Sequence, residues 1–239
     1  MTKVTDPYLM IVNKEHHYDE SMLENFKIIP IKDSDGDSYI EETTYNALQE
    51  LFAFLKSSMH YNGEVVSAGR KPETQEQIRK DFFNTYYNQF KNQGLSDEQA
   101  MDEAQKKLDS RVALPYQSEH HLGLCVDIDV YGNFSKFIKS LINNPTFNVK
   151  YDGLRRRLGT KTKALKTVGE IMADYGFILR FPDGKSDITG FPKEDWHIRY
   201  VGKDHAKIIT ENNLTLEEYV SALESGKTFP NPQETQPNS

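Results

Sequence analysis

The chain has 239 residues, a net charge of -7 at pH 7 and an apolar fraction of 37%. This length allows one large domain with a buried core. The aromatic fraction of 11% argues against disorder over most of the chain, and the negative charge argues against nucleic acid as a partner. Cys125 is the single cysteine, so an internal disulfide and a cysteine-rich zinc knuckle are excluded. We therefore expect any metal site to use histidine and carboxylate side chains.

Neither a membrane span nor a secretory signal is visible. No stretch approaches the length of a transmembrane helix, and the apolar run at residues 7–12 is short and directly preceded by Asp6. The sequence as written predicts a cytoplasmic protein, or a protein of the cell envelope if a leader has been removed.

The predicted elements follow the spacing of apolar residues and the capping and turn signals. The acidic run at residues 33–37 is interpreted as a turn, because position twelve of a calcium loop would hold Thr44 and not glutamate. In chain order, the predictions are a short strand at 8–13, a helix at 44–59, a strand at 64–68, helices at 72–92 and about 97–108, a strand at 122–130, a helix at about 161–175, strands at 177–181 and 196–201, and a last helix from Thr215 to Gly226.

These elements mix helices and strands without a regular βαβ rhythm. They predict an α+β fold with a small, mostly antiparallel sheet covered by helices. We expect one domain over residues 1–228, with insertions at about 76–115 and 131–160. The segment 229–239 is rich in Pro, Asn and Gln and is predicted to be a disordered tail.

A candidate metal site begins at the strand predicted for residues 122–130. His120 precedes this strand, and Asp127 and Asp129 lie on its polar face. A neutral imidazole and a carboxylate are good zinc ligands. A histidine–aspartate hydrogen bond that ties a turn to the strand is an equally consistent interpretation of this segment alone.

A second segment, residues 194–197, adds an imidazole and a carboxylate. A catalytic zinc takes three protein ligands and keeps a fourth position open. His120, Asp127 and His197 can supply the three ligands. Glu194 is then available as a base. Taken singly, Glu194 also fits an exposed loop carboxylate, and Trp196 fits a core ring.

Together these segments resemble the VanY-type D-alanyl-D-alanine carboxypeptidases, with the related D,D-dipeptidases and L,D-carboxypeptidases. The family pattern is S-x-H-x-x-G-x-A-x-D followed downstream by E-x-W-H, and it is matched here by Ser118, His120, Gly123, Asp127, Glu194, Trp196 and His197. Cys125 takes the place of the family alanine, and we expect it to pack as a small apolar residue. Residues 67–75 resemble the family's S-G-Y-R-S-x-x-x-Q, in which Arg70 and Gln75 match while Gly69 replaces the usual tyrosine.

The resemblance implies a Zn²⁺ peptidase in which zinc polarises the scissile carbonyl and lowers the pKa of water to about 7. It implies that Glu194 is the general base and that Arg70 stabilises the oxyanion or fixes the substrate. Gln75 and Ser118 would bind the substrate's terminal carboxylate. Apart from the resemblance, Arg70 is also compatible with capping a helix or pairing with Glu73, an arrangement of little energetic value.

The sequence also suggests roles for four further residues near these motifs. His121 is expected to be exposed and not bound to metal, and Arg199 and Tyr200 are expected to be structural. Asp129 fits either an orienting contact to a ligand or a strand residue that faces solvent.

The implied substrate is a peptidoglycan stem peptide or precursor that ends in D-alanine. The same motifs serve D-Ala-D-Ala dipeptidases and L,D-carboxypeptidases, which stay open as alternatives. An endopeptidase of the wall, which would use the same zinc chemistry, and a wall-binding module without catalysis are weaker alternatives. Loss of Glu194 or of a zinc ligand would mark the binding module, and none of these residues is lost.

Overall fold

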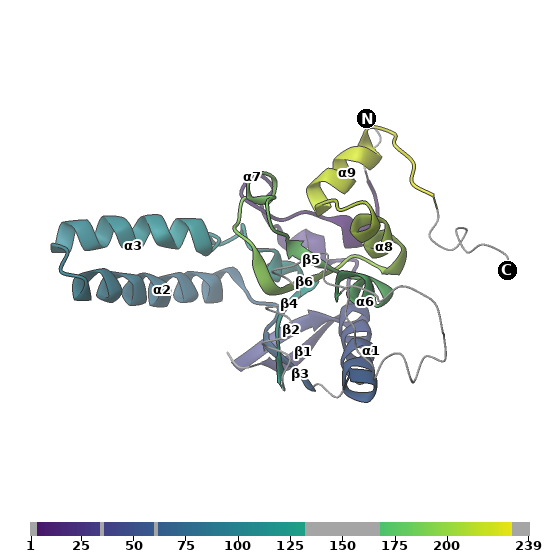
Figure 1. Ribbon diagram of the computed structural model, residues 1–239, viewed down its shortest axis with the longest axis horizontal. Coiled ribbons are helices and arrows are strands. Elements are labelled where there is room, and N and C mark those ends of the chain that lie inside the picture. Colours follow the sequence, from purple (N-terminus) through teal and green to yellow (C-terminus); the bar gives the residue numbers. More distant parts are fainter. Residues whose placement is uncertain (1–3, 34–35, 60–61, 132–167, 231–239) are drawn as a thin grey trace.

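A computed structural model describes residues 4–33, 36–59, 62–131 and 168–230 (Figure 1). The elements in chain order are η1 (Pro7–Leu9), η2 (Glu20–Leu23), β1 (Ile28–Asp33), β2 (Gly36–Glu41), α1 (Glu42–Met59), β3 (Asn62–Ser67), α2 (Pro72–Asn92), α3 (Asp97–Arg111), η3 (Glu119–Leu122), β4 (Cys125–Tyr131), α6 (Val168–Asp174), β5 (Phe177–Phe181), α7 (Ser186–Thr189), β6 (Glu194–Tyr200), α8 (Lys203–Glu211) and α9 (Leu216–Glu224).

Four strands form an antiparallel sheet in the order β3-β4-β6-β5, and β1 and β2 form a separate antiparallel hairpin. The predicted α+β class with a small antiparallel sheet is therefore confirmed. Strands β4 and β6 pair in a register that places Asp127 opposite His197. Two predicted zinc ligands thus lie side by side on one face of the sheet, as directly paired cross-strand residues do.

The two faces of the sheet have different roles because side chains alternate along each strand. Val126, Ile128 and Ile198 belong to a buried apolar cluster that includes residues of α1, such as Leu48 and Leu51. A second cluster joins α8 and α9 to Ile178 of β5. Figure 1 shows α1 below the labels of β5 and β6, and α9 above them. Two apolar layers therefore hold the polar residues of β4 and β6 in place.

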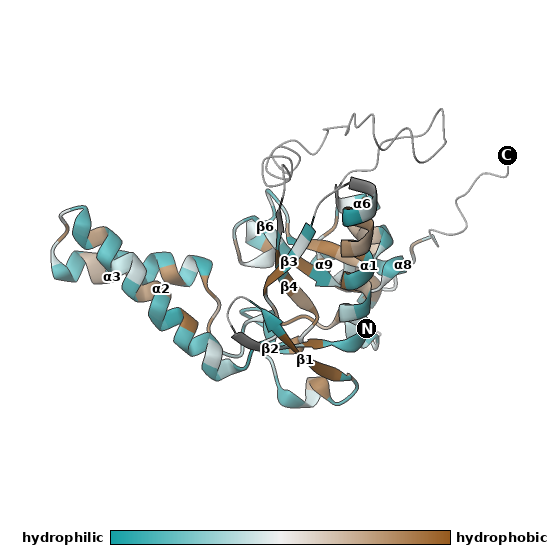
Figure 2. Cartoon of the chain, turned by 90° about the horizontal axis from the view of Figure 1, so that it is seen from below, coloured by the Kyte–Doolittle hydropathy of each residue, from teal (hydrophilic) through white to brown (hydrophobic). Residues whose placement is uncertain are grey.

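Helices α2 and α3 form an antiparallel pair that projects away from the sheet (Figure 1). Ala100, Ala104 and Leu108 are buried at a spacing of four residues, which places them on one face of α3. The predicted capping box of Ser96 and Gln99 is present at the start of α3. This pair of helices, the helical arm, is largely hydrophilic on its outside (Figure 2). The insertion expected at about 76–115 falls on this pair.

One predicted element along the chain was wrong, and other elements were not predicted. Residues 8–13 do not form a strand, because Pro7 and the Asp6 carboxylate, which accepts from the Tyr8 N–H at 2.9 Å, start a 3₁₀ turn instead. Strands β1 and β2, which flank the turn predicted at 33–37, were not predicted. They pair with each other, and β1 contains Pro30. Helix α8 was not predicted at all.

Part of the predicted organisation lies outside the described residues. This applies to residues 132–167, which hold most of the insertion at 131–160 and the start of the helix expected at 161–175, and to the tail from residue 231. Phe229, which we placed in the tail, packs against Tyr219 with ring centroids 5.2 Å apart. Over the described part of the chain, none of the helices is both long and apolar enough to span a membrane.

Candidate active site

The predicted site residues come together in one cleft of about 590 Å³. Its lining includes Arg70, Gln75, Ser118, His120, Asp127, Glu194, Trp196 and His197. The helical arm forms part of the wall through residues of α2 such as Asp81, Phe82 and Tyr86. Residues separated by more than a hundred positions in the sequence thus share one concave surface, which is the usual form of a small-molecule site.

The carboxylate of Asp127 lies between the two histidines. Its Oδ2 atom is 3.5 Å from Nε2 of His120, and its Oδ1 atom is 3.1 Å from Nδ1 of His197. The two imidazole rings meet edge to face, with centroids 4.9 Å apart. The opposite nitrogen of each ring is engaged elsewhere: Nδ1 of His120 lies 2.6 Å from the Ala68 carbonyl oxygen, and Nε2 of His197 lies 2.9 Å from Glu119 Oε1.

With their other nitrogens engaged, the two histidines turn hydrogen-bond acceptors toward the carboxylate of Asp127, which is itself an acceptor. A neutral imidazole that donates through one nitrogen carries a lone pair on the other, so when both rings are neutral, His120 Nε2 and His197 Nδ1 direct lone pairs at an ionised carboxylate. The Oδ1 atom of Asp127 is buried and has no hydrogen-bond partner. Such a group is costly unless a cation is present. The donor set therefore fits a divalent metal ion, and both outer nitrogens have the supporting contacts typical of metal-binding histidines.

The electrostatics of His120 point the same way. Burial lowers the pKa of His120 and so does Arg70, but Cys125 and Asp127 outweigh them and raise this pKa to about 9. The site thus favours a positive charge between these groups.

Cys125 adds a donor that we had expected only to pack in the core. It is fully buried, as expected. Its sulfur and the ligating atoms of His120 and His197 also lie within 4.8 Å of one another. A thiolate is a strong zinc ligand, so two ligand sets, one with Asp127 and one with Cys125, can be compared by experiment.

Glu194 stands at the start of β6, beside the histidines. Its Oε2 atom is 3.6 Å from Nδ1 of His197, and burial raises its pKa above the ordinary glutamate range. It is therefore not the exposed loop carboxylate that we had kept as an alternative. The core-ring alternative for Trp196 is also wrong, because this side chain is 47% exposed and lines the cleft.

Arg70 is positioned by contacts within the protein. Its Nε donates to Gln75 Oε1 at 2.6 Å, and its Nη1 donates to Ser67 Oγ at 2.9 Å. The amide nitrogen of Gln75 donates in turn to the Ala113 carbonyl at 2.8 Å. Among the ion pairs of the described residues none joins Arg70 to Glu73, so the surface-pair alternative is not observed.

Three further expectations from the sequence concern Ser118, His121 and Asp129. Ser118 is buried, lines the cleft and makes no side-chain cap to η3. His121 is fully buried, so the expectation that it is exposed was wrong; its Nδ1 donates to the Arg70 carbonyl and its Nε2 accepts from the Tyr116 N–H. Asp129 is exposed, which favours the solvent-facing alternative.

The glycine at position 69, where the family pattern has a tyrosine, has a steric explanation. A Cβ atom there would lie 2.4 Å from the Tyr39 carbonyl oxygen and 2.5 Å from the Tyr39 ring. The two residues also exchange backbone hydrogen bonds of 2.7 and 3.2 Å. The Tyr39 hydroxyl lies within hydrogen-bonding distance of the carbonyl oxygens of Arg70 and His121. Tyr39 therefore fills the space beside the missing side chain and supports the backbone of two site residues.

Gly69→Ala is expected to destabilise the fold by on the order of 1–3 kcal/mol, the usual cost of overpacking. The new methyl group must displace Tyr39 or separate the paired backbones, and both changes shift Arg70. Chemical denaturation with a two-state fit measures the effect. An unchanged midpoint would show that the contact between Tyr39 and Gly69 is not constrained as described.

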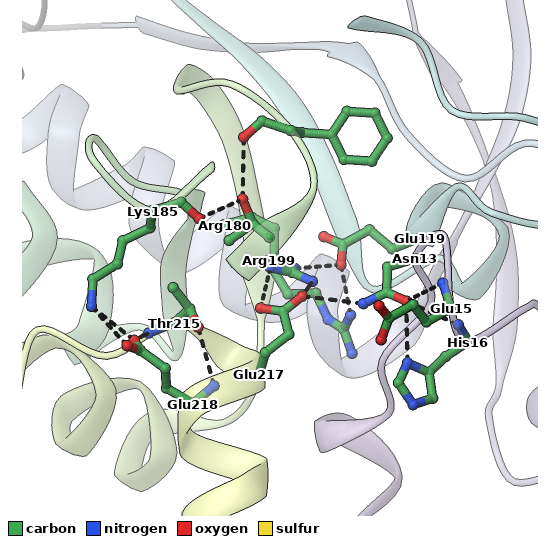
Figure 3. Close-up of polar contacts among 12 residues, drawn as sticks. Asn13, Glu15, His16, Glu119, Arg180, Lys185, Arg199, Thr215, Glu217 and Glu218 are labelled. Atoms are coloured by element: carbon green, nitrogen blue, oxygen red, sulfur yellow. Dashed lines mark hydrogen bonds and ion pairs between the residues drawn. The ribbon is translucent and has the colours of Figure 1, made fainter. Parts of the chain in front are cut away.

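Sequence reasoning missed a buried charged cluster that contacts His197 through Glu119. Figure 3 shows Glu119 with Arg180 and Arg199. We did not single out Glu119 or Arg180, and we expected Arg199 only to be structural. All three are buried, and both arginines donate to Glu119 Oε2. One signal was available for Arg180: it stands inside the otherwise apolar strand β5, and a buried charge requires a partner.

The chain resembles curated relatives over this region. It is 33% identical over 175 residues to a D-alanyl-D-alanine carboxypeptidase of Enterococcus faecalis (strain ATCC 700802 / V583), covering 73% of this chain and 53% of the relative. It is 38% identical over 108 residues to the bifunctional D-Ala-D-Ala dipeptidase and D-Ala-D-Ala carboxypeptidase VanXYC of Enterococcus gallinarum, covering 45% of this chain and 48% of the relative. The chain thus spans about half the length of these curated relatives.

Solved structures with the same fold cover nearly the whole chain. The vancomycin-resistance D,D-pentapeptidase VanY in complex with Zn(II) superposes with a TM-score of 0.61 at 27% identity, over 90% of this chain and 99% of that chain. VanYB in complex with D-alanine-D-alanine gives the same TM-score and identity, over 90% and 97%. The model of the VanY D-alanyl-D-alanine carboxypeptidase family matches residues 37–203. This match covers more than half of the chain and includes every predicted site residue, so the protein belongs to the VanY family.

Proposed function

We propose that this protein is a zinc-dependent carboxypeptidase that removes a C-terminal D-alanine from peptidoglycan stem peptides or their precursors. The observation that carries the proposal is the buried Asp127 carboxylate between the unengaged nitrogens of His120 and His197, with Glu194 beside them in the same cleft. The related structures with Zn(II) and with D-alanine-D-alanine support the choice of metal and substrate.

In this proposal, Nε2 of His120, the carboxylate of Asp127 and Nδ1 of His197 hold the zinc ion. When bound, zinc polarises the scissile carbonyl and makes water a nucleophile near neutral pH. The Ala68 carbonyl and Glu119 keep the proton of each ring on the nitrogen that faces away from the metal.

Glu194 is the proposed general base. Its carboxylate accepts the proton of the attacking water and passes it to the leaving amine. Partial burial raises the pKa of Glu194, which brings its proton affinity closer to that of a group that works at neutral pH. Asp195, its neighbour, forms an ion pair with Lys193 at 3.3 Å instead.

Arg70 and Ser118 are proposed to bind the substrate's anionic groups. A guanidinium is a permanent cation with forked donors, and Arg70 is placed at the cleft with Nε and Nη1 already engaged. The Gln75 amide is bonded to Arg70 at one end and to Ala113 at the other. Gln75 thus contributes to carboxylate binding through the orientation of Arg70.

The decisive test offers the zinc-loaded protein a stem pentapeptide, a stem tetrapeptide and free D-Ala-D-Ala, with mass spectrometry of the products. Loss of one D-alanine from the pentapeptide supports the proposal. Cleavage of the tetrapeptide alone would assign the L,D-carboxypeptidase alternative, and cleavage of the free dipeptide alone would assign the dipeptidase alternative. The dipeptidase alternative is included in the test because one curated relative combines dipeptidase and carboxypeptidase activities.

Amidation of the pentapeptide C-terminus should remove most of kcat/KM, because an amide cannot satisfy a cationic donor as a carboxylate does. Arg70→Ala should lower kcat/KM mainly for the free acid and so reduce the difference between the two peptides. Steady-state kinetics on both peptides measures this. Equal cleavage of amide and acid by the unmodified protein would exclude an exopeptidase and favour an endopeptidase of the wall.

A further inference from the structure

Glu119 joins the metal-site histidines to a buried network of charges. It lies in η3, directly before His120, and its side chain is 3% exposed. Its Oε1 atom accepts from His197 Nε2 at 2.9 Å. Its Oε2 atom accepts from Arg180 Nε at 2.8 Å and from Arg199 Nη1 at 3.1 Å. One oxygen thus serves the histidine, and the other serves the arginines.

The arginines are themselves anchored to distant parts of the chain, and Figure 3 shows the contact between Arg180 and Glu217. Arg180 makes a two-pronged contact to Glu217 of α9, with distances of 3.0 and 2.5 Å. Arg199 donates through Nη2 to the backbone carbonyls of Tyr8 and Met10, at 3.0 and 2.8 Å. Glu119 therefore has little freedom to rotate, because three elements and the N-terminal segment hold its partners.

The charges of this network balance. Two guanidinium groups face two carboxylates, those of Glu119 and Glu217, so the network carries no net charge. A buried carboxylate with two charge-assisted donors on one oxygen keeps the other oxygen as a fixed acceptor. That acceptor determines which nitrogen of His197 bears the proton, because the ring must donate from Nε2.

We propose that Glu119 is a positioning residue for the metal site, which keeps Nε2 of His197 protonated and Nδ1 directed at Asp127. Arg180 and Arg199 act on the site through Glu119. The inference rests on the proposed metal site and adds a carboxylate to it that touches neither metal nor substrate. Outer contacts of this kind typically change metal affinity by about 10–100-fold when they are removed.

The test compares Glu119→Gln with Glu217→Gln as a matched control. Each substitution removes one negative charge from the same guanidinium of Arg180, but only Glu119 contacts His197. Zinc affinity is measured by competition with a chelator, without substrate. We expect Glu119→Gln to weaken zinc binding by about 10–100-fold, and Glu217→Gln to leave it within about threefold of the unmodified protein. Equal losses in both variants would overturn the proposal, because the effect would then come from the network's general stability.

A second measurement does not depend on any variant folding. In the zinc-loaded unmodified protein, ¹⁵N-edited spectra of the histidine rings should show His197 bound through Nδ1, with a slowly exchanging proton on Nε2. Metal binding through Nε2 would overturn the proposal. Neither readout requires turnover, so an inactive but correctly loaded protein would count against the proposed carboxypeptidase and not against the role of Glu119.

Discussion

Glu194→Gln is expected to keep stoichiometric zinc while kcat falls by on the order of 10²–10⁴-fold, the usual contribution of a general base. The amide has nearly the shape of the carboxylate but cannot take a proton from water. Glu194 is not needed as a ligand in the proposed site, because His120, Asp127 and His197 fill three positions. Single-turnover kinetics and elemental analysis on the same sample separate the loss of chemistry from the loss of metal.

Asp195→Asn is the matched control. Asp195 is adjacent in the sequence, carries the same charge change and contacts Lys193 instead of a histidine. It should retain most of the activity. A variant pair in which Glu194→Gln is active and Asp195→Asn is not would transfer the role of base to Asp195.

His120→Ala should abolish stoichiometric zinc binding, because it removes the imidazole whose Nε2 atom faces Asp127 and leaves two protein ligands. Elemental analysis after dialysis measures the bound metal. A thermal unfolding curve of the metal-free variant checks that the fold survives. Full zinc occupancy in His120→Ala would contradict the proposed ligand set.

Cys125→Ala discriminates between the two ligand sets that the geometry allows. It introduces the residue that the family pattern has at this position, and it removes the sulfur that approaches both histidines. If Asp127 is the third ligand, the variant keeps one zinc per chain. Loss of zinc in Cys125→Ala, together with its retention in Asp127→Asn, would make the thiolate the ligand instead.

The elements that carry the site were predictable because their patterns are local. Strand β4 alternates apolar and polar residues, and α3 begins with a capping box, so both signals are complete within about ten residues. The hairpin of β1 and β2 was missed for the opposite reason: β1 contains Pro30, and its pairing depends on a partner strand with a polar, turn-like start. Helix α8 begins at Lys203 with Gly202 as its N-cap and no side-chain cap, so no start signal was visible.

The residues of the site were predictable to the extent that they belong to motifs. The burial of His121 and the role of Glu119 were not, because their partners are remote. Glu119 contacts residues 61, 78 and 80 positions away, and His121 contacts the Arg70 carbonyl 51 positions away. A glutamate beside two histidines has the same appearance in the sequence whether it faces water or a pair of arginines. Only the sheet register, which aligns β5 with β6, brings Arg180 and Arg199 to one place.

The anchoring of the two arginines sets how much chain a working unit requires. The family match ends at residue 203 and begins at residue 37, yet Arg199 donates to Tyr8 and Met10, and Arg180 donates to Glu217. A protein trimmed to the matched region would retain both buried guanidinium groups and lose these acceptors. A broken buried ion pair costs about 3–5 kcal/mol, a large fraction of the stability of an ordinary domain. The matched region is thus shorter than the unit that these contacts hold together in this protein, and the flanking segments supply partners to its buried charges.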